Sequence, residues 1–234
     1  MWVSLLVAAV TPGFSLLTYF YLKDRYDAEP VHTVLRLFAI GFLLVFPTMF
    51  VQRGAVLALG ESPFLFSFVV SGGIEEFLKW FIIYFMLFNQ PLFNEPYDGV
   101  VYSVAVSLGF ATMENVLYAF AQPSHPLSLL LRALLPVSGH ALFAVVMGFY
   151  FGKAKFDEVA RSRLILCSLA LPIIVHGMFD YIQIAFPDDW VWIVFPFTAG
   201  LWILAMILVR KALERSPFRY VFRDETIKVS ANGQ

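Results

Sequence analysis

The sequence predicts an all-α membrane protein, a polytopic transmembrane helix bundle with about seven spans. Of its 234 residues, 60% are hydrophobic and only 14% are charged, whereas soluble domains contain about 45–50% apolar and 25% charged residues. The mean hydropathy is +0.77. The apolar residues also gather in runs of roughly 20, which is the length that an α-helix needs to cross the hydrocarbon core of a bilayer.

Seven apolar runs, separated by polar or Pro/Gly-containing connectors, define the expected helices. In chain order they cover residues 2–22, 32–51, 64–88, 98–120, 127–152, 164–186 and 190–211. The first run lacks the positively charged region of a cleavable signal peptide, so we expect a retained span. The mildly apolar stretch near 51–63 leaves open a further, re-entrant segment. We expect a transmembrane domain over 1–215 and a polar cytoplasmic tail over 216–234.

The basic residues predict how the bundle is oriented, because short basic loops stay on the cytoplasmic side of a membrane. The first connector, the fifth connector and the tail hold two, four and six of the 16 Lys and Arg residues. With seven spans these three segments share one side, and Arg53 and Arg132 lie on the other. We therefore expect the N-terminus outside and the C-terminus in the cytoplasm.

Composition argues against two classes of protein: nucleic-acid-binding proteins, and redox or zinc-finger proteins that use paired cysteines. The net charge of −1 provides no basic surface for nucleic acid. The single cysteine, Cys167, has no partner for an intrachain disulfide or a CxxC motif. The polar connectors are all short, so functional residues should lie in or beside the bilayer.

Ionisable and polar side chains interrupt the four middle spans. Each ionisable group costs about 2.5–3.5 kcal/mol at the centre of a membrane helix, so such groups normally face an interior site. The candidate site residues are Glu75, Glu76, Lys79, Glu114, Asn115, His140, His176 and Asp180.

The spacing of these residues predicts one shared pocket. At about 1.5 Å per residue they lie roughly 9–20 Å below the expected outer ends of their spans. Glu75 and Lys79 are four residues apart, as are His176 and Asp180, so each pair shares a helix face. Glycines next to these residues would allow the helices to approach closely.

This residue set suits hydrolysis by activated water. A carboxylate can take a proton from water, and histidines can stabilise an oxyanion or hold a metal ion. The chain has no HExxH or GxSxG motif, and Ser138 beside His140 is weak support for a serine-type site. From the residues alone, a proton- or cation-coupled transporter and an ion pair of the acids with Lys79 remain open.

Several ordered motifs carry a resemblance to a known family. They read YLKDRYDAEP, EEFLKW, EPYDGVVYSVAVSLGFATMENVLY, SGHALFAVVMGFYFG and VHGMFDY. The chain resembles the PrsW family of bacterial intramembrane proteases, and it is distantly similar to the CAAX prenyl proteases. Where the latter have F-x-x-x-H and H-x-x-x-N, this chain has Phe110-x-x-x-Glu114 and His176-x-x-x-Asp180. The exchanged residues make the expected site more anionic, which favours a divalent cation.

The resemblance implies an endoprotease of the bacterial cell membrane. It would make the first, outer-side cut in a single-pass membrane protein, such as an anti-sigma factor, with membrane lipid as its other partner. Glu75 and Glu76 would supply the base and its partner, with Lys79 and Asp180 as orienting residues. A divalent metal, zinc by ligand type, or a metal-free glutamate mechanism fits this pattern. The metal ligands would be Glu76, Glu114, His140 and His176.

Overall fold

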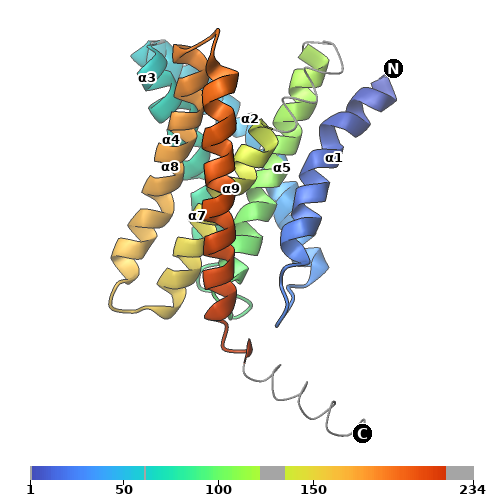
Figure 1. The fold of residues 1–234 in the computed structure, drawn as a ribbon, viewed down its shortest axis with the longest axis vertical. Helices are drawn as coiled ribbons and strands as arrows, with labels where there is room; N and C mark the ends of the chain where they lie inside the picture. Colours follow the sequence, from blue (N-terminus) through green and yellow to red (C-terminus); the bar gives the residue numbers. More distant parts are fainter. Residues whose placement is uncertain (1, 61, 122–134, 220–234) are drawn as a thin grey trace, which may run out of the picture.

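The computed structural model describes residues 2–60, 62–121 and 135–219, and within these ranges every regular element is helical. The all-α prediction is therefore confirmed (Figure 1). The elements are α1 (Trp2–Tyr21), α2 (Val31–Leu59), α3 (Pro63–Leu65), the π-helix η1 (Phe66–Ser71), α4 (Gly72–Met86), α5 (Asp98–Ala121), α7 (Pro136–Phe156), α8 (Arg161–Ala185) and α9 (Trp190–Glu214).

Six helices in the described ranges are long and apolar enough to cross a membrane: α1, α2, α5, α7, α8 and α9. The expected third span is divided among α3, η1 and α4, so no single regular helix covers it. The start of the expected fifth span, the side assigned to Arg132 and most of the predicted tail lie outside the described residues. The orientation across the membrane stays a prediction.

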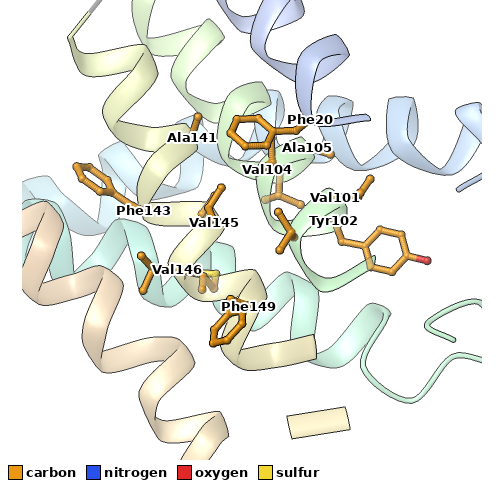
Figure 2. Packing of buried hydrophobic residues seen from close by; sticks show 14 of the residues in the cluster. Phe20, Val101, Tyr102, Val104, Ala105, Ala141, Phe143, Val145, Val146 and Phe149 are labelled. Carbon is orange, nitrogen blue, oxygen red and sulfur yellow. The ribbon is translucent and has the colours of Figure 1, made fainter. Parts of the chain in front are cut away.

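Helices α5 and α7 form the centre of the bundle. In their spanning segments 83% and 89% of the residues are buried, against 22–33% in the other four candidate spans. Helices α1 and α2 pack against α5, while α8 and α9 pack against α7. At their contact a Cβ atom at Gly99 would collide with the carbonyl of Gly148, and one at Gly148 would collide with the carbonyl of Gly99. Figure 2 shows buried residues of both helices, among them Val104 on α5 and Val145 on α7. Both helices are apolar on every side, as expected of helices enclosed by others.

Glycine brings α2 against α5. A Cβ atom at Gly41 would collide with the backbone of Val106, and one at Gly109 would collide with the carbonyl of Phe38. Only glycine therefore permits this separation of the two helix axes.

Helix α2 extends beyond its predicted end at residue 51. It continues to Leu59 and stops at Gly60, whose φ of 81° is a conformation that favours glycine. The stretch from 51 to 59 is therefore regular helix rather than a re-entrant loop. The polar Gln52 did not end the helix, because its side chain has a partner inside the bundle.

Candidate active site

Glu76 lies at the centre of the candidate site. Its side chain, on the first turns of α4, is fully buried. Its Oε1 atom accepts a hydrogen bond from Lys79 Nζ at 2.8 Å and lies 2.9 Å from Nδ1 of His176 on α8. Glu76 thus connects α4 to α8 through polar contacts in the interior.

Lys79 supplies the positive charge that this group of acids needs. Its Nζ atom lies 3.4 Å from Oε2 of Glu75 and 3.1 Å from Nδ1 of His140. It also lies 4.3 Å from the centroid of the Phe110 ring. An ammonium group has three hydrogens and no lone pair, so all of these nitrogen and oxygen atoms act as acceptors.

His140 contacts α5 through its other ring nitrogen. Nδ1 accepts from Lys79, so Nε2 carries the hydrogen and donates to Oε2 of Glu114, which lies 2.9 Å away. Glu114 is half-buried and faces the pocket. The carboxylate therefore sets the tautomer of the imidazole.

His176 has the same arrangement on α8. Its Nδ1 points at Glu76, and its Nε2 lies 3.4 Å from Oδ2 of Asp180. Ser71 at the end of η1 donates to the same Asp180 oxygen at 2.5 Å. The ring also stacks on Phe143, with centroids 4.8 Å apart. Both ring nitrogens and one ring face are thus held in place.

The π-helix before α4 contributes to this geometry. In η1 the amide of Gly72 donates to the carbonyl of Ser67, five residues earlier. The side-chain Nε2 of Gln52, on α2, donates to the Val70 carbonyl at 3.2 Å and to Oε1 of Glu75 at 3.1 Å. Single π-helical turns are often found at functional sites, and here the turn is followed directly by the two glutamates.

A polar cavity of about 160 Å³ opens onto this group. A water molecule occupies about 30 Å³ in the liquid, so the cavity has room for several. Its lining residues are Ser71, Glu75, Glu114, Pro136, His140, Phe143, His176, Phe179, Asp180 and Gln183. Glu75 is therefore the glutamate that faces the cavity, and Glu76 lies behind it.

The donor atoms fit a divalent metal ion. Glu75, Glu76, His140 and His176, which we call the active-site cluster, each offer one ligand atom, and these atoms lie within 4.8 Å of one another. Ligand atoms around tetrahedral zinc are about 3.3–3.6 Å apart, so modest side-chain movements would suffice. Oε2 of Glu76 is buried and has no hydrogen-bond partner in the described part of the chain.

The orientation of the two imidazoles gives a second reason for the fit. Each histidine turns Nδ1 toward the cluster and Nε2 toward a carboxylate, Glu114 or Asp180. Metal-binding histidines usually have such a carboxylate on the nitrogen that does not bind the metal. Lys79 contacts three of the same donor atoms, so its ammonium would have to withdraw from them when a metal binds.

Seven of the eight sequence-predicted residues come together, and Asn115 does not. It follows Glu114 by one residue and points about 100° away around the helix, where its amide donates to the Ala9 carbonyl of α1 at 3.1 Å. The structure also differs from the predicted metal ligands. Glu75 belongs to the four-donor cluster, while Glu114 contacts the far nitrogen of His140.

Sequence reasoning missed three contacts: Gln52, Ser71 and Phe143. Ser71 lies four residues before Glu75, so helical spacing was a usable signal for it. Phe143 likewise lies three residues after His140. Gln52 had only one signal, its polarity within an apolar stretch.

Comparison with known proteins gives a consistent result. The model of the PrsW family intramembrane metalloproteases matches residues 29–210. The chain is 48% identical to a protease PrsW of Geobacillus kaustophilus, covering 89% of this chain and 92% of that one. It is 46% identical to a protease PrsW of Bacillus subtilis, covering 89% and 95%, and 32% identical to one of Clostridioides difficile, covering 78% and 80%. No solved structure matches the chain.

Proposed function

This chain belongs to the PrsW family of intramembrane metalloproteases, and from that membership we propose that it makes the first, outer-side cut in a single-pass membrane protein. An anti-sigma factor is the substrate class that we infer, and the bacterial cell membrane is the location. The observation that carries the proposal is the buried cluster of two glutamates and two histidines beside a polar cavity. Membership in a protease family sets aside the transporter alternative.

The position of the cavity supports an outer-side cut. The residues that line the cavity belong to the beginnings of α4 and α7 and to the last turns of α8. These helix ends lie in the upper half of Figure 1. The opposite end of the bundle carries basic residues. Lys23 follows the end of α1, Lys155 lies in the last turn of α7, and Arg161 is the first residue of α8. Basic residues favour the cytoplasmic side, so the cavity would face outward.

We infer that Glu75 is the general base. Its carboxylate faces the cavity, and Gln52 holds one of its oxygens. It would accept a proton from the attacking water and return it to the leaving amine. Glu76, which lies behind it, has no such access to water.

The two histidines and Glu76 would hold the metal, and Glu75, whose donor atom lies within 4.8 Å of theirs, would stay available as the base. Zinc is our inference from the nitrogen and oxygen donors. When bound, the ion would lower the pKa of a bound water and polarise the scissile carbonyl. Asp180 and Glu114 would keep Nδ1 of each imidazole directed at the ion. Phe143 and Phe179 would limit bulk water in the cavity.

Purified protein in liposomes, together with a membrane-anchored tester peptide, tests this proposal. We expect cleavage that a chelator stops and zinc restores, and that His176→Ala lacks. Cleavage that persists after metal removal would contradict the metal mechanism. Cleavage by His176→Ala at the wild-type rate would contradict the site. Cleavage only on the side of the bilayer that faces Lys23, Lys155 and Arg161 would contradict the proposed outer cut.

A further inference from the structure

Four buried acids meet at the other end of the bundle. Asp24 and Glu29 come from the connector between α1 and α2, and Glu95 and Asp98 come from the connector between α4 and α5 and the first residue of α5. Their exposed fractions are 8%, 3%, 0% and 0%. We call them the acidic cluster. Asp98 precedes Glu114 on α5 by 16 residues, which places the acidic cluster about 24 Å from the active site along the helix.

The acidic cluster has the geometry of ligands around one ion. Asp24, Glu95 and Asp98 each offer a carboxylate oxygen, and these atoms lie within 4.8 Å of one another. One oxygen of Asp98 and one of Glu95 already accept hydrogen bonds from the protein. Oδ2 of Asp98 accepts from the amides of Asn94 and Glu95, both at 2.8 Å, and Oε2 of Glu95 accepts from the hydroxyl of Ser216. Each of these two carboxylates therefore keeps a second oxygen for another partner.

Five of the remaining oxygens have no hydrogen-bond donor among the residues that the structure describes. Both carboxylate oxygens of Asp24 are buried without a hydrogen-bond partner, as are Oε2 of Glu29, Oε1 of Glu95 and Oδ1 of Asp98. Within the described part of the chain, no Lys or Arg forms a salt bridge with any of the four acids. Buried carboxylates without a partner are costly, so groups of this kind normally have a counter-charge.

The local electrostatics agree with a missing positive charge. Burial, with the nearby charge of Glu95 adding to it, raises the pKa of Asp24 to about 8. Burial also raises the pKa of Glu29 and of Glu95. The ionised forms of these acids are thus penalised unless a cation lies between them.

We propose that the acidic cluster binds one hard divalent cation, of the Mg²⁺ or Ca²⁺ class, through Asp24, Glu95 and Asp98 with Glu29 beside them. Among the described residues, every donor in the group is an oxygen, which is the ligand that these ions prefer, and no nitrogen or sulfur ligand belongs to it. This site is separate from the active-site cluster, and it accounts for Asp24 and Glu29 in YLKDRYDAEP and for both acids in EPYDGVVY, which catalysis does not use.

The ion would connect three segments. Asp24 belongs to the first connector, Glu95 to the connector before α5, and the Glu95–Ser216 contact reaches the segment after α9. A cation there would hold together the ends of helices on both sides of the core. Its expected effect is on stability rather than on the chemical step.

Thermal unfolding of the purified full-length protein tests the site. After chelation, millimolar Ca²⁺ or Mg²⁺ should raise the Tm by about 5 °C. The ion that raises the Tm at the lower concentration is the one that the acidic cluster binds more tightly. Asp24→Asn should lose this response. Glu158→Gln, which removes an exposed acid near the start of α8, should keep it. His176→Ala should also keep it, because the active-site cluster is not involved.

Three outcomes would overturn the proposal: the wild type shows no Tm response to either ion, the response survives in Asp24→Asn, or the response vanishes in His176→Ala. In the first case, a higher Tm of Asp24→Asn than of the wild type would show that protons neutralise the acids instead. If Asp24→Asn does not fold, Tb³⁺ luminescence of the wild type, excited through the nearby Tyr97 and displaced by Ca²⁺ or Mg²⁺, replaces it. Absence of displaceable luminescence would equally refute the site.

Discussion

Nδ1 of His176 lies 2.9 Å from Oε1 of Glu76, although the two residues are 100 positions apart in the chain. This contact joins α8 to α4 in a region that the sequence alone marks as lipid-embedded. It also places the first of two imidazoles beside the pair of glutamates, so the consequences of changing either residue can be derived from the geometry.

Glu76→Gln should nearly abolish proteolysis. The amide keeps the shape of the side chain but removes the charge that faces Lys79 and His176. Because we assign Glu76 as a metal ligand and a neutral amide is a poorer ligand than a carboxylate, the cleavage rate is expected to fall to the level of the metal-depleted protein. The rate on a membrane-anchored peptide should be measured beside Asp188→Asn, an exposed acid whose loss should change nothing. Cleavage within threefold of the wild type would refute the role of Glu76.

Lys79→Met should destabilise the metal-free protein by about 3–5 kcal/mol, because it leaves buried carboxylates without their counter-charge. Zinc should reduce this loss, since the ion and the ammonium neutralise the same oxygens. Denaturation with and without zinc measures both quantities. An equal loss under the two conditions would indicate that the metal and Lys79 act at different places.

Ser71→Ala should lower metal affinity and activity about 10-fold or more. It removes the hydroxyl that holds Asp180, which in turn orients His176, and loss of such outer partners typically costs 10–100-fold. Ser67→Ala is the matched control, because the buried hydroxyl of Ser67 has no hydrogen-bond partner among the described residues. Metal affinity and cleavage rate should be measured for both variants. Equal values for Ser71→Ala and Ser67→Ala would argue against a role of the Ser71–Asp180 contact.

Gly72→Ala should disturb the packing of α4 on α8. A Cβ atom there would lie 2.9 Å from the Gly177 amide nitrogen and 3.1 Å from the Ile173 carbonyl. Overpacking of this kind costs about 1–3 kcal/mol. Gly200→Ala, which meets nothing within 4 Å, should be neutral or slightly stabilising because alanine favours helix. Parallel Tm measurements distinguish the two, and a neutral Gly72→Ala would mean that α4 and α8 can move apart freely.

Asn115→Ala should reduce stability but leave the activity of the folded fraction unchanged. Its amide holds the Ala9 carbonyl of α1, away from the cavity. A loss of roughly 1 kcal/mol is expected for one buried hydrogen bond. Cleavage rate per folded molecule is the relevant measurement. A tenfold lower rate would return Asn115 to the group of catalytic residues.

The helical class and the convergence of seven polar residues could be predicted from the sequence, since apolar length and i,i+4 spacing are local properties. The end of α2 could not, because Gln52 reads as a polar break until its partner Glu75 is known. The π-helical turn is equally hidden, since its hydrogen bonds depend on packing rather than on residue type.

Asn115 illustrates the other limit. In the sequence it is adjacent to Glu114 and equally polar. Helical geometry turns it about 100° away from Glu114, but only the position of α1 decides that this direction leads to Ala9 rather than to the site. The preference of the cluster for Glu75 over Glu114 has a similar origin. Which carboxylate reaches the centre depends on the distance between α4, α5 and α7, and no spacing in the chain encodes that distance.

The size of the cavity restricts what form a substrate can take. A sphere of 160 Å³ is about 7 Å across, which is less than the roughly 10–12 Å width of an α-helix with its side chains. If the substrate is the transmembrane segment that we propose, it would therefore have to unwind into an extended strand before its peptide bond could reach Glu75. Segments that contain Gly or Pro near the scissile bond lose the least by unwinding, so local helix weakness would select the cleaved bond.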